Sequence, residues 1–328
     1  MHRYSYSALP LLAFISAMHT YPAHAPAPAI KPDAPIPTGL NKDIYDVRPL
    51  LHPARKFFGV FRSGAPKVMK PVDEYAALVG KRPNVIVSYA QWGDEFDSAG
   101  VSNAWKSGAL TAISWEPKVT PVTSIADGAY DQYIRSYAAA ARRINIPVVI
   151  SFADEMNGDW ESWGTAGTTP QEYVRSWRHI HDVFEQSEAE NVIWAWSPNM
   201  IKPGTRADLE KFYPGDRYCD WVGIVGYFTD WDPHTFDGLF GDTLAELRRF
   251  TQKPNFILET GAMPGRHRAS DIAALFSGVS TDPGIIGFAW FDSNSRQDWR
   301  LSVNPEGVVA FRRYAQNPLY GFDPREIK

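Results

Sequence analysis

The sequence contains few of the features that mark several common classes of protein. Its single cysteine, Cys219, excludes an intramolecular disulfide, and we expect it to be a small buried side chain. The formal net charge is only −4 with both signs mixed, so there is no basic stripe and nucleic acid is not an expected partner. No apolar run approaches the roughly 18 residues that a membrane-spanning helix needs. We therefore expect no membrane span.

Motifs of cofactor and nucleophile chemistry are also missing. The chain has no His-Glu-x-x-His motif, no paired cysteines and no EF-hand spacing, so the sequence predicts no metal site and no other cofactor. No Gly-x-Ser-x-Gly motif indicates a serine hydrolase. No Gly-x-Gly-x-x-Gly motif follows an early apolar run, which disfavours a dinucleotide-binding fold.

The N-terminus has the organisation of an export signal. Residues 1–25 combine an early arginine, an apolar stretch over 8–18 and an Ala-His-Ala sequence at their end, which is typical of a cleaved secretory signal. Residues 26–45 begin with a proline-rich segment that predicts an extended leader. We therefore expect a secreted or periplasmic monomer whose folded domain spans residues 46–328.

Short apolar runs recur along this domain. They are nearly continuous in apolar residues, which is typical of parallel strands that are buried on both faces. The runs cover residues 57–62, 85–92, 110–117, 147–155, 192–199, 221–228, 255–262 and 285–292.

Helical patterns separate most of these runs. Residues 128–146 place apolar side chains on one stripe, and so do residues 169–186. Thr169, Pro170 and Glu172 are suited to begin the second helix, as cap, first-turn proline and dipole-matching acid. Eight strand–helix cycles predict an α/β fold, a single-domain (β/α)₈ barrel. An open doubly wound sheet is the alternative.

Acidic and aromatic residues gather where the apolar runs end. In a (β/α)₈ barrel the carboxyl ends of the strands form the active site. Two carboxylates stand out, Glu155 at the end of the fourth run and Glu259 in the seventh. Two carboxyl groups with different protonation states are what cleavage of a glycosidic bond requires. Flat aromatic rings beside polar groups suit the faces and hydroxyls of sugars. The chain has 12 tryptophans, and candidates for such contacts are Trp92, Trp115, Trp160, Trp163, Trp196, Trp231 and Trp290.

These motifs resemble a known family. The segment ADEMNGDWESWG (153–164) is similar to the His-Glu-Met-Asn-Gly-x-Trp-x-x-Trp-Gly signature of glycoside hydrolase family 26, the β-mannanase family of clan A. The segments SWEP (114–117), WAWSPN (194–199), YPGDRYCDWVGIVGY (213–227), ILETGA (257–262) and FAWFD (288–292) resemble further motifs of that family in matching order. The resemblance implies a retaining glycosidase.

The resemblance also implies roles for individual residues. Glu155 would be the general acid/base and Glu259 the nucleophile, about 5–5.5 Å apart as in retaining pairs. Tyr227 matches a tyrosine that hydrogen-bonds the nucleophile. Trp290 matches a tryptophan that forms a sugar platform. Trp160 and Trp163 match aromatics that line the cleft.

One position departs from the family pattern. Asp154 stands where the family has histidine, and we expect it to accept a hydrogen bond from a substrate hydroxyl while ionised. Its charge should also raise the pKa of the neighbouring carboxyls. The sequence thus predicts an exported endo-β-glycosidase that acts on β-mannan, mixed-linkage β-glucan or a self-made exopolysaccharide. The alternative is a non-catalytic carbohydrate-binding or polysaccharide-assembly protein on the same barrel.

Overall fold

The computed structural model describes residues 44–202, 204–205 and 208–327. The predicted signal segment (1–25) and nearly all of the predicted leader (26–45) lie outside these residues. In the part of the chain that is described, no helix is both long and apolar enough to cross a bilayer.

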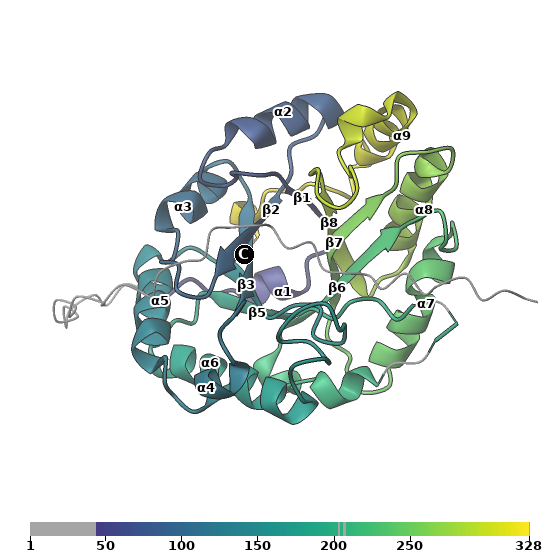
Figure 1. Ribbon diagram of the computed structural model, residues 1–328. Coiled ribbons are helices and arrows are strands. Elements are labelled where there is room, and N and C mark those ends of the chain that lie inside the picture. The colour runs from purple at the N-terminus through teal and green to yellow at the C-terminus, as the bar shows by residue number, and fades with distance from the viewer. Residues whose placement is uncertain (1–43, 203, 206–207, 328) are drawn as a thin grey trace, which may run out of the picture.

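All eight apolar runs form strands. Each strand pairs in parallel with the next, and β8 also pairs with β1 along the whole of β1. The barrel is therefore closed, as predicted, and the open-sheet alternative is wrong (Figure 1). The strands are β1 (Phe57–Phe61), β2 (Val85–Gln91), β3 (Leu110–Glu116), β4 (Val148–Phe152), β5 (Val192–Trp196), β6 (Trp221–Phe228), β7 (Asn255–Ala262) and β8 (Ile285–Phe291).

Helices surround the barrel in an outer layer (Figure 1). Both helices predicted from periodicity are confirmed, and Thr169 and Glu172 form a complete capping box at the start of α6. Two short 3₁₀ helices, η1 (Leu209–Phe212) and η2 (Asp216–Tyr218), connect β5 to β6. The α-helices of the layer are α2 (Lys70–Val79), α3 (Ser98–Lys106), α4 (Val122–Ala126), α5 (Asp131–Ile144), α6 (Pro170–Gln186), α7 (Phe236–Leu247), α8 (Arg268–Thr281) and α9 (Pro305–Ala315).

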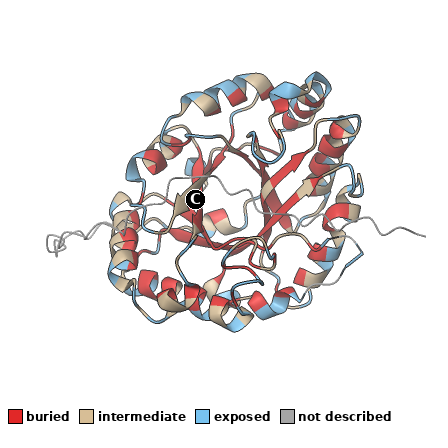
Figure 2. Cartoon of the chain, in the orientation of Figure 1, coloured by how far each residue is buried: buried red, intermediate tan, exposed pale blue. Residues whose placement is uncertain are grey.

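Alternate residues of each strand enter two different cores, because successive strand side chains point to opposite faces. One core fills the barrel, and the other lies between the barrel and the helices, where Figure 2 shows buried helix faces turned toward the strands. The short helix α1 (Arg48–Leu51) contributes Leu50 to the inner core. Its Leu51 carbonyl accepts the Trp221 indole N–H at 3.2 Å. Since Trp221 begins β6, α1 covers the amino end of the barrel, and the carboxyl ends of the strands lie at the opposite end.

Candidate active site

The chain makes an unusual turn where β4 ends. Ala153 and Glu155 both have positive φ, 49° and 57°, a conformation that non-glycine residues adopt rarely and that concentrates at functional sites. The Glu155 N–H donates to the Ser197 carbonyl after β5 at 2.8 Å. This contact ties the turn to the neighbouring strand and leaves the Glu155 side chain partly exposed.

Two donors hold the Glu155 carboxyl group. The Trp160 indole N–H donates to Oε2 at 3.1 Å, and the Asn199 amide donates to Oε1. Burial, followed by the negative charge of Asp154, raises the pKa of Glu155 to about 7, and the two hydrogen bonds act in the opposite direction. A carboxyl group with this pKa can both give and take a proton near neutral pH.

Glu259 occupies a different setting in β7. The pairing register between β6 and β7 shifts just before it, and such bulges re-aim side chains beside active sites. The Tyr227 hydroxyl from β6 donates to Glu259 Oε1. Burial raises the pKa of Glu259 to about 8, whereas a hydrogen bond to the ionised form acts in the opposite direction.

Tyr227 links the two carboxyl groups. Burial raises its pKa well above the usual value, and the negative charges of Glu155 and then Asp154 raise it further. Both acids therefore lie near the phenol that donates to Glu259. The phenol keeps its proton, so it remains a donor at any physiological pH.

Asp154 is more enclosed than the sequence predicted. Its side chain is buried, and Oδ1 accepts a hydrogen bond from the Ser114 hydroxyl of β3. Burial raises its pKa and the Ser114 bond opposes that shift. Nearby, Lys118 Nζ pairs with Glu116 at 2.6 Å, and burial followed by the Asp154 charge raises the pKa of Glu116 to about 7. A charged network therefore lies behind Glu155.

Four of the predicted sugar-binding tryptophans do not face the site. The structure buries them almost completely, between 0% and 2% exposed, so in this structure they have no ring face to offer a sugar. Strand alternation gives the reason for β3, β5 and β8, because their terminal tryptophans point outward to the helices. The fourth turns its indole N–H back to the Asp154 carbonyl at 2.7 Å. These four buried tryptophans are Trp115, Trp163, Trp196 and Trp290.

The other three tryptophans are more accessible. Trp160 is partly buried and contacts Glu155 as described. Trp92 is also partly buried and stacks on Trp115 at 4.7 Å between ring centroids. Trp231, in the loop after β6, is 76% exposed. Trp92, Trp160 and Trp231 therefore remain candidates for contact with a substrate.

Several residues at the site were not assigned from the sequence. Asn199 lies in the WSPN segment, three residues after the last tryptophan of β5, and it contacts Glu155 directly. Phe61, Tyr89 and Phe291 form a partly exposed aromatic cluster with inward-facing positions on β1, β2 and β8. Strand alternation could have identified such positions from the sequence. On β8, for example, Phe291 follows the outward-facing Trp290 and therefore faces inward.

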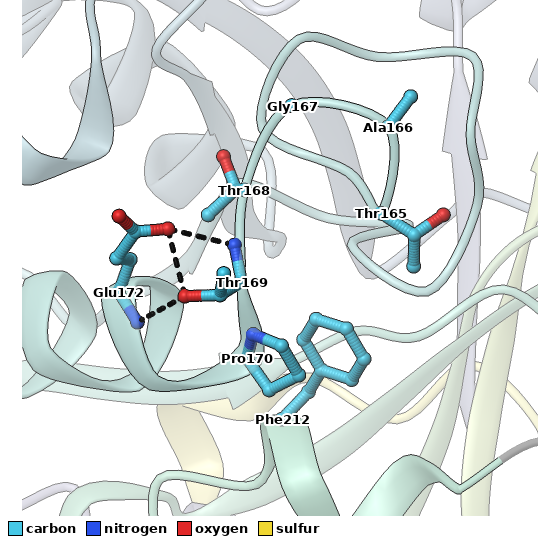
Figure 3. A pocket seen from close by; sticks show the side chains of 8 residues that line it. All are labelled: Thr165, Ala166, Gly167, Thr168, Thr169, Pro170, Glu172 and Phe212. Carbon is cyan, nitrogen blue, oxygen red and sulfur yellow. Dashed lines mark hydrogen bonds between the residues drawn. The ribbon is translucent and has the colours of Figure 1, made fainter.

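A separate hollow of about 500 Å³ lies at the start of α6 (Figure 3). It is formed by the later part of the loop that carries Glu155, together with Phe212. The polar side chains around it are already bonded within the protein: Thr169 and Glu172 bond each other, and Thr165 donates to the Gly158 carbonyl at 3.0 Å. This hollow is therefore not a candidate for the catalytic site.

The described residues contain one cluster with metal-ligand geometry, formed by His181, Asp182 and Glu185 of α6. It lies on the outer helix layer. Arg217 already pairs with Glu185 at 3.2 Å, and its positive charge competes with a cation. The cluster is thus poorly suited to hold a metal.

The closed (β/α)₈ barrel, with one hydrogen-bonded carboxyl group in the turn after β4 and another on β7, is the arrangement expected of a barrel-type glycoside hydrolase. The model described as Glycosyl hydrolase family 26 matches residues 96–263. This range contains both Glu155 and Glu259. The chain belongs to this family, as the motifs predicted.

Known relatives carry several activities. Endoglucanase H of Acetivibrio thermocellus is 27% identical over 255 residues, which cover 74% of this chain and 28% of that protein. Beta-1,3-xylanase TXYA of Vibrio sp is 28% identical over 227 residues, which cover 65% and 45%. The chain therefore spans less than half the length of these two relatives. The catalytic domain of the GH26 endo-beta-1,4-mannanase of Bacillus sp. JAMB-750 shares the fold, with a TM-score of 0.65, 18% identity, and coverage of 83% and 88%.

Proposed function

We propose that this protein is an exported, retaining endo-β-glycosidase with Glu155 as acid/base and Glu259 as nucleophile. The observation that carries the proposal is the Tyr227 phenol, which donates to Glu259 and lies within the electrostatic reach of Glu155. One donor thus holds Glu259, and the charge of Glu155 acts on the same phenol. Family membership supports the reaction class.

The first step uses the two groups together. Glu155 gives its proton to the glycosidic oxygen, while a Glu259 oxygen bonds to the anomeric carbon and the leaving sugar departs. The Tyr227 hydrogen bond favours ionised Glu259, and burial beside Asp154 favours protonated Glu155. Because burial raises the pKa of Glu259 to about 8, the hydrogen bond from Tyr227 is what must keep this carboxylate ionised for the attack.

The second step restores the enzyme. Glu155, now ionised, takes a proton from water, and the oxygen of that water bonds to the anomeric carbon as the bond to Glu259 breaks. Asn199 and Trp160 donate to the Glu155 carboxylate and hold it in place between the steps. The sugar leaves with its original anomeric configuration.

The proposed substrate is a β-linked polysaccharide: β-mannan, mixed-linkage β-glucan or an exopolysaccharide of the same cell. The relatives are named for glucan, xylan and mannan cleavage, so the family alone does not select one. A panel of these polymers, assayed for new reducing ends and for product size, tests the proposal. Short and mid-length products from the parent, and none from Glu259→Ala, are expected.

The non-catalytic alternative rests on Asp154, which departs from the family pattern. It predicts that the parent protein migrates more slowly in a gel that contains the polysaccharide, but releases no reducing ends from any polymer. That result would overturn the enzyme proposal. An active parent whose Glu259→Ala variant still binds the polymer would overturn the alternative.

Export and oligomeric state are part of the same proposal. We expect protein recovered from the periplasm or medium to begin at Pro26 by intact mass, and to elute as a monomer. Retention of residues 1–25 in a protein that stays inside the cell would contradict export.

A further inference from the structure

The loop after β8 returns over the site as a small hairpin. Asn294 and Asp298 form an antiparallel bridge, and the Trp299 N–H donates to the Ser293 carbonyl at 3.0 Å. The hairpin places the Trp299 indole against the Tyr227 ring, with 4.4 Å between the ring centroids and 37° between the planes. Trp299 is 7% exposed, so its ring serves packing more than contact with solvent.

Two buried groups hold the backbone of Trp299. Its carbonyl accepts a hydrogen bond from Arg268 Nη2 at 2.7 Å and another from the Trp290 indole at 3.2 Å. Both donors are 0% exposed. A guanidinium is costly to bury, and here its described partner is this loop carbonyl. Trp290, which the sequence suggested as a sugar platform, thus anchors the residue that packs on Tyr227.

Gly261 of β7 completes the arrangement. A Cβ at this position would lie 3.1 Å from Trp299 Cε3 and 3.1 Å from Tyr227 Cδ1. Both rings therefore rest on the same stretch of bare backbone, two residues beyond Glu259. The phenol is confined by Trp299 on one side and by β7 on another.

We propose that Trp299 is a positioning residue that aims the Tyr227 hydroxyl at Glu259. The inference rests on the proposed function, because it concerns the alignment of the proposed nucleophile. Without the indole, the Tyr227 ring can rotate and its hydroxyl leaves Oε1. A misplacement of about 1 Å can cost roughly 10²-fold in rate, so the packing contact acts on catalysis through the phenol alone.

A double-mutant cycle in kcat tests this role. Trp299→Ala is expected to lower kcat about 10-fold or more in the parent, with KM changed less than about twofold. In a Tyr227→Phe background the same change should alter kcat less than about twofold, because the hydroxyl it aims is already gone. Trp299→Phe should recover most of the activity, since a phenyl ring still supports the phenol.

A buried tryptophan elsewhere provides the matched control. Trp196 is 0% exposed and packs on Tyr213 and Phe250 outside β5. Trp196→Ala should lower the melting temperature at least as much as Trp299→Ala, yet act equally on kcat with and without the Tyr227 hydroxyl. Equal effects of Trp299→Ala in the two backgrounds would overturn the proposal. A rise in KM with unchanged kcat would overturn it as well, because that result makes Trp299 a sugar contact.

Crystal structures give a readout that does not depend on turnover. In Trp299→Ala, or in Gly261→Ala if the first variant does not fold, the Tyr227 hydroxyl should lie beyond hydrogen-bond distance of Glu259. A Tyr227 that keeps its bond in either variant would overturn the positioning role. An inactive parent with a displaced Tyr227 in the variant would contradict the proposed function and leave the positioning role supported.

Discussion

The two halves of the barrel mouth surround their carboxyl groups differently. Around Glu155, strands β3 to β5 bring together charged groups, with Asp154 beside it and the Glu116–Lys118 pair behind. Around Glu259, strands β6 to β8 bring aromatic rings, with Tyr227 as donor and Trp299 packed on it. Glu155 thus meets a negative charge as well as two neutral donors, whereas the donor to Glu259 is one phenol that a packed indole supports.

This difference corresponds to the two proposed roles. A neighbouring negative charge favours the protonated form of a carboxyl group, which an acid needs. A neutral donor favours the ionised form and fixes its direction, which a nucleophile needs. Burial is the largest cause that raises both pKa values, to about 7 for Glu155 and about 8 for Glu259. The hydrogen bond from Tyr227 opposes the shift at Glu259. Experiments that change one half at a time test this division.

The largest effects are expected from removing the carboxyl groups themselves. Glu259→Ala should lower kcat on the order of 10⁴-fold or more on any substrate, because no glycosyl-enzyme can form. Glu155→Ala should spare the first step for aryl glycosides with good leaving groups, since their departure needs little protonation. Azide should then raise turnover by attacking the glycosyl-enzyme. Burst kinetics and product analysis on an activated aryl glycoside measure both effects.

Equal losses in the two variants without azide rescue would break the comparison, because the two groups would then share one role. A crystal structure offers an independent check. The two carboxyl groups should lie about 5–5.5 Å apart, whereas a separation near 9 Å would indicate inversion.

The sequence predicted the barrel well because continuous apolar runs carry a strong local signal. It could not fix which face each side chain takes, since one position along a strand exchanges the two cores. The family resemblance made Trp290 a candidate sugar platform, although its outward position on β8 buries it. The positive φ of Glu155 and the register shift before Glu259 depend on tertiary contacts. For that reason Asn199 and Trp299 became visible only in the structure.

Removing the charge of Asp154 should have a smaller effect, which concerns the half of the barrel mouth around Glu155. Asp154→Asn removes the negative charge that raises the Glu155 pKa, while its side-chain oxygen can still accept from Ser114. The Glu155 pKa should fall, so the alkaline limb of kcat/KM should move to lower pH. At pH values above this limb, lowering the pKa of Glu155 by one unit lowers the protonated fraction of Glu155 about tenfold. A pH profile of the variant and of an Asp159→Asn control, an exposed acid in the same loop, measures this.

An unchanged limb in Asp154→Asn would show that Asp154 is not a source of the Glu155 shift. A rise in KM at every pH without a moved limb would instead support the original expectation that Asp154 accepts from a sugar hydroxyl.

Trp231 should give a smaller effect confined to long substrates. It is the most exposed aromatic of the predicted set and lies in the loop after β6, near the aromatic half. Stacking of this kind contributes about 0.5–1.5 kcal/mol, so Trp231→Ala should raise KM for polymer roughly 2- to 10-fold. KM for a short aryl glycoside should not change. A matching rise on both substrates would place Trp231 at the cleavage point.

The smallest effects concern stability, and they separate the halves most finely. A carboxyl group whose folded pKa lies above its unfolded value of about 4.3 stabilises the fold below that pH, and the contribution is lost as pH rises through the folded pKa. With folded pKa values of about 7 and about 8, neutral glutamine should raise the melting temperature at pH 8 and leave it nearly unchanged at pH 4.

Glu259→Gln keeps an oxygen for Tyr227, whereas Glu155→Gln turns its amide toward one of the two donors Asn199 and Trp160. The gain at pH 8 should therefore be larger at 259, about 2–4 °C for each kcal/mol. Calorimetry at both pH values measures these gains, with the exposed Glu95→Gln as control. A larger gain at 155 than at 259 would contradict this expectation.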